Sequence, residues 1–154
     1  MSQIDARLQE LGITIPDVAT PVASYVPAQT TGNLLYTAGQ LPFVDGALVQ
    51  TGKVGGEVSA AQATELARIC TLNALAAAKS VLGSLDRITK IVKVNGFVAS
   101  VPEFIGQPGV LNGASELLGD IFGDIGKHAR ATVGVAVLPL DAPVEVELIV
   151  EFQA

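Results

Sequence analysis

The chain has 154 residues, and nine Lys or Arg residues against fifteen Asp or Glu residues give it a net charge of −6 and a pI of about 4.6. Hydrophobic residues make up 49% and charged residues 16% of the sequence, which excludes a disordered chain, and the acidic balance disfavours binding to nucleic acid. This length predicts one domain over 1–154. Because so small a domain cannot bury this much apolar surface alone, the mean hydropathy of +0.49 favours contacts between copies of the chain.

The scarcity of cysteine and histidine limits the chemistry of any site. The chain has one cysteine, Cys70, and one histidine, His128, which excludes an internal disulfide, a Cys-based zinc site and a His-rich metal site. The first residues lack the layout of a signal peptide, and no apolar run approaches the roughly 20 residues that span a bilayer. We therefore expect a cytoplasmic protein that holds no metal and does not bind membranes.

An N-terminal extension over 1–20 is predicted to contain a short helix and an extended connector. Ser2 and Asp5 have the spacing of a helix cap, and Gly12 provides a stop. Pro16 and Pro21 favour extended chain after the helix.

The next segment predicts a β-hairpin and a second tight turn. Strands over 22–29 and 34–39 are separated by the turn sequence Thr-Gly-Asn at 31–33. Asp-Gly at 45–46 lies between short apolar stretches and predicts the second turn.

Two long helices are predicted on either side of a strand. Ser59 with Gln62 has the pattern of a capping box, and the helix that starts there ends at Gly83. A strand over 88–99 follows, and then a second helix over 110–122.

Two strands are predicted at the end of the chain, over 131–138 and 144–152. We expect them to pair antiparallel through the turn between them, which would bring Arg130 and Glu145 to the same end of the ladder. The order of elements predicts an α+β fold, with a mixed sheet that carries two long helices on one face. We expect the other sheet face to pack against sister subunits.

Arg130 begins an otherwise uncharged strand and needs an anionic partner. Its planar fork suits a carboxylate, which is either an internal salt bridge to Glu145 or Glu147 or a group on a ligand. Glu145 is either a solvent-facing strand residue or a group that positions a water for an acid substrate beside Arg130.

Other side chains with chemical potential have simpler interpretations. Cys70 lies on the apolar face of a predicted helix and is expected to be a buried structural thiol. Tyr25 and Tyr36 are expected to pack in the first hairpin, and His128 to be a polar loop residue. No Ser-His-Asp or Cys-His set has support from spacing.

Several segments, taken in order, resemble the Rid family, also called the YjgF type and labelled endoribonuclease L-PSP-like. The resemblance covers nearly everything after about Pro21 and matches the longer branch of the family, with about 150 residues. The matching segments are YVP at 25–27, GNLLYTAGQLP at 32–42, KVNGFV at 93–98, ARATVGVAVLP at 129–139 and VEVE at 144–147.

The resemblance implies a chorismate-mutase-like fold in a homotrimer with a central barrel and three clefts between subunits. It also implies a small-molecule carboxylate substrate. Deaminase members hydrolyse reactive enamines and imines, such as 2-aminoacrylate, to a 2-keto acid and ammonia, and they need no cofactor.

The family roles carry over residue by residue. Arg130 corresponds to the arginine that clamps the substrate carboxylate, and Glu145 to the glutamate that orients or activates the attacking water. Thr132 would offer its main-chain carbonyl near that water. The substrate-binding positions correspond to Tyr25, Ala38, Gly39 and Asn112.

Two positions depart from the active deaminases, which commonly have serine at Ala38 and cysteine at Thr132. The loop over 101–110 is also longer than in short members. The departures motivate a second hypothesis, a trimer that binds a small carboxylate without catalysis. A third hypothesis, ribonuclease activity, has the acidic pI and the lack of a paired acid and base against it.

Overall fold

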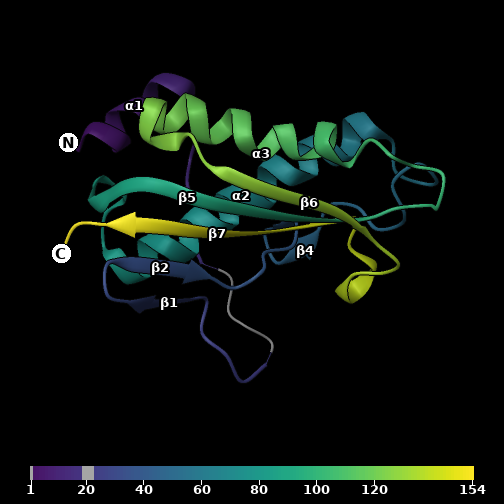
Figure 1. The fold of residues 1–154 in the computed structure, drawn as a ribbon, viewed down its shortest axis with the longest axis horizontal. Helices are drawn as coiled ribbons and strands as arrows, with labels where there is room; N and C mark the ends of the chain where they lie inside the picture. Colours follow the sequence, from purple (N-terminus) through teal and green to yellow (C-terminus); the bar gives the residue numbers. More distant parts are fainter. Residues whose placement is uncertain (1, 19–22) are drawn as a thin grey trace.

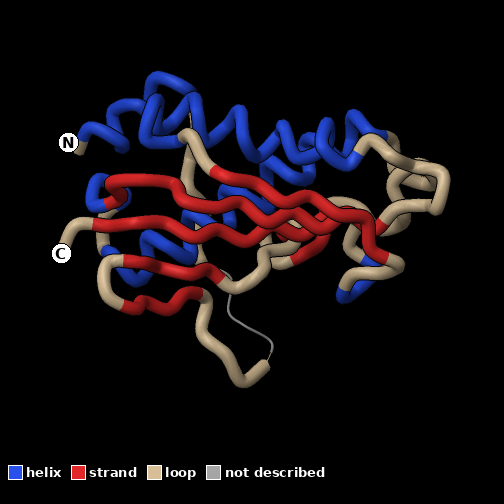
Figure 2. The backbone as a smooth tube through the Cα atoms, viewed as in Figure 1, coloured by secondary structure: helices blue, strands red, loops and turns tan. Residues whose placement is uncertain are grey.

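A computed structural model of the chain describes residues 2–18 and 23–154 and places two long helices on one side of a five-stranded sheet (Figures 1 and 2). The predicted α+β class, with a mixed sheet and two long helices on one face, is confirmed. Residues 19–22, part of the predicted connector and first strand, lie outside the described residues. The elements are α1 (Gln3–Leu11), β1 (Ala28–Thr31), β2 (Leu34–Thr37), β3 (Phe43–Val44), β4 (Ala47–Leu48), α2 (Ala60–Leu82), η1 (Leu85–Arg87), β5 (Ile88–Ala99), α3 (Gln107–Phe122), η2 (Gly123–Gly126), β6 (Ala129–Val135), η3 (Pro139–Asp141) and β7 (Val144–Phe152).

The strand β5 lies between β7 and β6, in the sheet order β1-β2-β7-β5-β6. It pairs antiparallel with β7 and parallel with β6. The expected antiparallel pairing of the last two strands is therefore wrong. The physical reason lies in the connections. The chain passes from β5 through α3 to β6 as a crossover, which makes β5 and β6 parallel. Residues 136–143 then carry the chain past the end of β5 to its other edge, where β7 pairs with it.

The pleat of the sheet directs alternate residues toward the helices and forms the core. Gly96 of β5 leaves room for Leu111 of α3, because a Cβ at position 96 would collide with the leucine side chain. The helix α2 is rich in alanine where it meets the sheet, which lets the two layers approach closely. The buried residues of β5 and β7 include Ile91, Val94, Val98, Val144, Val146, Leu148 and Val150.

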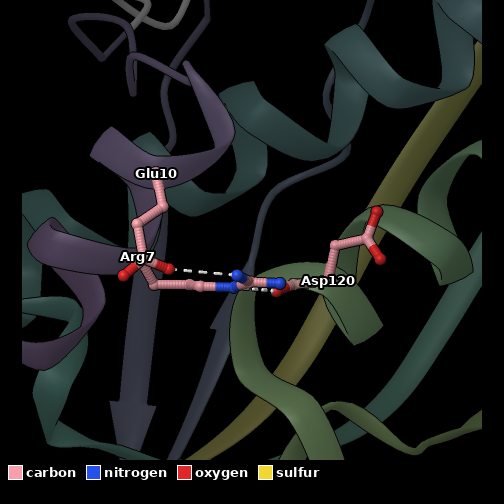
Figure 3. Close-up of polar contacts among 3 residues, drawn as sticks. All are labelled: Arg7, Glu10 and Asp120. Atoms are coloured by element: carbon pink, nitrogen blue, oxygen red, sulfur yellow. Dashed lines mark hydrogen bonds and ion pairs between the residues drawn. The ribbon is translucent and has the colours of Figure 1, made fainter.

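The N-terminal helix α1 is capped as predicted, by Ser2 at its start and by Gly12 in a left-handed conformation at its end. Arg7 fixes this helix to the end of α3. Its Nε donates to the main-chain oxygen of Asp120 at 2.8 Å, and its Nη1 donates to Glu10 at 3.1 Å (Figure 3). The extension therefore packs on the helical layer of the fold.

The predicted turns are confirmed, although the first strand is shorter than expected. The turn between β1 and β2 contains Gly32 with φ +58°, and Asp45 and Gly46 both have positive φ between β3 and β4. Positive φ at both central residues is the conformation that Asp-Gly turns favour. The strand predicted over 22–29 begins only at Ala28.

Cys70 is fully buried on α2, and its Sγ donates to the main-chain oxygen of Val144 at 3.5 Å. Burial, and to a lesser extent the charge of Glu145, raises the pKa of the thiol. The expected buried position is confirmed.

In the part of the chain that the structure describes, no helix combines the length and apolar character needed to cross a membrane.

Gly113 and Gly119 provide a matched pair of substitutions within α3. A Cβ at Gly113 would collide with the main-chain oxygen of Thr64 in α2, whereas a Cβ at Gly119 would meet nothing. We expect Gly113→Ala to lower the free energy of unfolding by about 1–3 kcal/mol, because the helices must move apart. We expect Gly119→Ala to raise it by up to about 1 kcal/mol, because alanine favours helix. Urea denaturation of both variants tests this packing, and equal effects would contradict it.

Candidate functional site

Arg130 lies at the start of β6, on the side of the sheet that faces α3. Its register partner in β5 is the buried Val94. Its Nη1 donates to Asn112 Oδ1 at 2.9 Å and to Ser115 Oγ at 3.2 Å, and its Nη2 donates to the main-chain oxygen of Pro108 at 3.2 Å. All three acceptors belong to α3, so this helix holds the guanidinium. We refer to Arg130, Asn112, Ser115 and Pro108 as the arginine cluster.

Arg130 has no acidic partner among residues 2–18 and 23–154, where the ion pairs join Arg7 to Glu10, Lys53 to Asp141 and Lys127 to Asp124. The internal salt bridge to Glu145 or Glu147 is therefore not formed. Nε of Arg130 has no acceptor within these residues, and Nη2 bonds a single acceptor. The guanidinium thus retains donors for an anionic group, and such charge-assisted bonds are strong.

Thr132 lies two residues beyond Arg130 on the same side of the sheet, in register with Gly96. Its Oγ1 is buried and has no hydrogen-bond partner among the residues that the structure describes. Buried hydroxyls in folded proteins nearly always have a hydrogen-bond partner. This atom therefore marks a position where a ligand group or a water would supply the missing hydrogen bond. The family resemblance directs attention to the main-chain carbonyl of Thr132, whereas the unpartnered atom is the hydroxyl.

Glu145 lies at the start of β7, on the open side of the sheet, in register with Phe97 of β5. Gly39 lies against its carboxylate, because a Cβ at position 39 would collide with Glu145 Oε1. Only glycine leaves this space free. We refer to Ala38, Gly39 and Glu145 as the glutamate cluster.

A β-bulge places the glycine there. Tyr36 pairs with Ile149 and Gln40 pairs with Val146, so four steps along one strand (36 to 40) face three steps along the other (146 to 149). The extra residue falls in the segment 37–39 and ends the predicted strand over 34–39 at residue 37. Bulges re-aim side chains and are frequent beside active sites.

Hydrogen bonds to β7 and to α2 hold the chain on either side of Gly39. Thr37 Oγ1 accepts a hydrogen bond from the main-chain nitrogen of Leu148 at 3.0 Å. The buried Asn73 of α2 donates to the main-chain oxygens of Leu41 and Phe43, each at 3.0 Å. The position of Gly39 beside Glu145 is therefore fixed by the core.

The environment of Glu145 favours its protonated form. Burial raises the pKa of this carboxyl, and the neighbouring charge of Glu147 raises it further. Asn95 Nδ2 donates to Glu147 Oε1 at 3.1 Å, whereas Glu145 has no hydrogen-bond donor among the described residues. A half-buried carboxyl whose pKa lies above its ordinary value is a stronger base than an exposed one and is suited to take up and return a proton.

The arginine and glutamate clusters lie on opposite sides of the sheet. β5 separates β6 from β7, so the two strands are about 10 Å apart, and Arg130 faces the helices whereas Glu145 faces away from them. The expectation that both residues lie at one end of a shared ladder is wrong, because it depended on the pairing of β6 with β7. Among residues 2–18 and 23–154, three of the grooves have volumes of about 470, 740 and 290 Å³, and neither Arg130 nor Glu145 lines any of these three.

The remaining predicted residues lie on the open side of the sheet or in the segment that precedes β1. Tyr25 is 51% exposed in a bend before β1, and the main-chain nitrogen of Ala38 donates to the oxygen of the nearby Pro27 at 2.8 Å. Tyr36 is exposed on β2. Within the described ranges, no three His, Cys, Asp or Glu residues gather as metal ligands.

Three polar residues make contacts in the site region that were not anticipated. Asn73 carries no local signal, since a single asparagine in a helix resembles a surface residue. Ser115 and His128 are 13 positions apart, yet Ser115 Oγ lies 2.8 Å from His128 Nε2. The loop assignment of His128 gave no indication of this contact, because α3 and the segment before β6 meet only in the folded chain.

Comparisons with known proteins find matches along nearly the whole chain. A family model described as "YjgF/chorismate_mutase-like, putative endoribonuclease" matches residues 5–152. Protein TCP17 of Trypanosoma cruzi is 42% identical over 150 residues, which cover 97% of this chain and 94% of that protein.

Two solved structures are similar along nearly the whole chain. The protein Atu1372 of Agrobacterium tumefaciens, of unknown function, is 49% identical with a TM-score of 0.90, and the match covers 98% of this chain and 94% of that one. A "putative endoribonuclease" of Shewanella oneidensis is 34% identical with a TM-score of 0.94, covering 98% and 100%.

The raised pKa of Glu145 predicts a pH-dependent effect on stability. Because ionisation is less favourable in the folded chain, the folded state loses stability as pH rises from the ordinary value of 4.5 through the raised pKa. We expect Glu145→Gln to raise Tm at pH 7.5, and by less at pH 4, where the wild-type carboxyl is protonated. Thermal unfolding at both pH values tests this.

The control is Glu151→Gln on the same sheet face, where Glu151 accepts a hydrogen bond from Thr89. We expect this variant to be no more stable than wild type, because the substitution weakens that hydrogen bond. A Glu145→Gln variant that is less stable than wild type at pH 7.5 would contradict the interpretation.

Proposed function

The chain belongs to the YjgF/chorismate mutase-like family, and we propose that it hydrolyses reactive enamines and imines of the 2-aminoacrylate type to 2-keto acids and ammonia. The observation that carries the proposal is the chemistry of Arg130. It is a cation held in place by neutral acceptors, with free donors and no acidic partner in the described chain. Such a group is suited to bind the carboxylate of a small substrate.

Glu145 supplies the second requirement, which is a group that takes a proton from water. Its raised pKa and its lack of a hydrogen-bond donor support this role. In the imine, water forms a bond to the C2 carbon while Glu145 accepts one water proton. Glu145 returns that proton to the nitrogen, which gives a carbinolamine. The carbinolamine hydroxyl then loses its proton to Glu145, which passes it to the amino group. The C–N bond breaks as the C=O bond forms, and ammonia and the keto acid leave.

The site that we propose lies between two protomers. A small imino acid held by Arg130 on the helix side of β6 does not reach Glu145 of the same protomer, which lies two strands away on the open side. β6 is an edge strand, and Val133 on it is 48% exposed. The arginine cluster of one protomer would meet the glutamate cluster of another, in the homotrimer with a central barrel that the family resemblance implies.

A second function has support from two residues. Ala38 lacks the serine hydroxyl common in active deaminases, and Thr132 replaces their cysteine and carries an unpartnered hydroxyl. A trimer with these residues would bind a small carboxylate without hydrolysing an imine. Ribonuclease activity is a weaker third alternative, because the chain is acidic.

An imine-trapping assay separates the first two functions. An amino-acid oxidase generates imino acids in the presence of semicarbazide, and we expect the wild-type protein to suppress semicarbazone formation. Arg130→Ala should abolish the suppression, because substrate affinity and orientation depend on the guanidinium. Arg68→Ala, on α2, should behave as wild type. Ligand-induced thermal stabilisation without any suppression would instead support the binding function.

Mixed oligomers test the position of the site between protomers. Arg130→Ala and Glu145→Gln are each expected to be inactive, but co-expression of the two variants should restore activity. With random mixing, roughly a quarter of the interfaces would pair an intact Arg130 with an intact Glu145. The measurement is the imine-trapping activity of the purified mixture. Mixtures as inactive as either variant alone would place both residues in one protomer.

A further inference from the structure

Ser115 and His128 extend the hydrogen bonds of Arg130 into a chain. Arg130 Nη1 lies 3.2 Å from Ser115 Oγ, and this oxygen lies 2.8 Å from His128 Nε2. His128 Nδ1 lies 2.6 Å from the main-chain oxygen of Gly126. The contacts are partly buried, and they connect α3, the end of η2 and the start of β6.

The two ends of this chain determine the direction of every hydrogen bond. Arginine can only donate, and a main-chain oxygen can only accept. Ser115 Oγ therefore accepts from Arg130 and donates to Nε2, and His128 carries its hydrogen on Nδ1. A neutral imidazole with Nδ1–H is the form that satisfies all three contacts, since a second hydrogen on Nε2 would leave the Ser115 hydroxyl without an acceptor there.

We infer that Ser115 and His128 are positioning residues, which orient the Arg130 guanidinium and thereby set the affinity for a ligand carboxylate. The inference rests on the proposed function in that it assumes Arg130 to be the carboxylate clamp. Asn112 and Ser115 engage both hydrogens of Nη1, and Pro108 engages one hydrogen of Nη2, so Nε and the second hydrogen of Nη2 are left for a ligand. Without the Ser115 hydroxyl, the guanidinium loses one of the hydrogen bonds that hold Nη1. Without His128 as its acceptor, this hydroxyl is no longer fixed in place.

The same contacts disfavour a nucleophilic role for Ser115. A serine nucleophile transfers its proton to histidine and creates an imidazolium. Here the guanidinium of Arg130 already donates to Ser115 Oγ, and its positive charge opposes a second positive charge on His128. Covalent labelling of Ser115 by diisopropyl fluorophosphate would overturn the positioning role.

The first test reads the tautomer of His128 directly. His128 is the only histidine, so the full chain labelled with ¹⁵N-histidine gives one pair of imidazole signals. At pH 8.5 we expect a protonated Nδ1 and an unprotonated Nε2, and a shifted Nε2 signal in Ser115→Ala. An Nε2–H tautomer in the wild type, or an Nε2 signal unaffected by Ser115→Ala, would overturn the inference.

The second test is a double-mutant cycle with 2-ketobutyrate as the probe and calorimetry as the measurement. Ser115→Ala and His128→Ala should each weaken binding by about five- to tenfold, the value of one hydrogen bond. The double variant should be no weaker than either single variant, because both act through one contact with Arg130. Ser115→Thr should retain affinity, and Ser80→Ala, outside the site, should match wild type.

In the imine assay, the two variants should raise KM while kcat stays within about twofold, since Glu145 is untouched. Additive losses, or no loss of affinity, would overturn the positioning role. A wild-type protein that binds 2-ketobutyrate without hydrolysing imines would contradict the proposed deaminase and leave the positioning role supported by the cycle. A wild type that binds no carboxylate would contradict both.

Discussion

The pleat of β5, β6 and β7 determines where the arginine and glutamate clusters lie. Val94, Gly96 and Val98 face the helices, and the register carries Arg130 and Thr132 to the same side. The antiparallel register with β7 places Glu145 on the other side. A shift by one residue would exchange these positions and bury the carboxylates of β7 among apolar side chains, so the core that fixes the register also fixes the separation of the two clusters.

Local structure was well predicted because its signals are local. The cap at Ser2, the capping box at Ser59 and the Asp-Gly turn at 45–46 each depend on residues a few positions apart. The pairing of the last strands was mispredicted because a short proline-containing connection is compatible with a hairpin or with a crossing past another strand. Only the long strand β5, which needs partners on both edges, decides between them.

The sequence directs attention to particular residues of the candidate site but does not give their arrangement in space. Arg130 and Glu145 attract attention because charges are scarce in their strands, and the family resemblance assigns them roles. Their positions on opposite sides follow from strand order, which no local pattern encodes. The supporting contacts were missed for the same reason: Asn73, Ser115 and His128 act on segments distant in sequence.

We propose above all that one ligand bridges the arginine cluster of one protomer and the glutamate cluster of another. The most direct measurement is a crystal structure of the protein with 2-ketobutyrate bound. The account predicts the ligand carboxylate on Arg130 of one protomer, with the keto carbon facing Glu145 of its neighbour. A ligand held by the residues of one protomer alone, or bound away from Arg130, would contradict it.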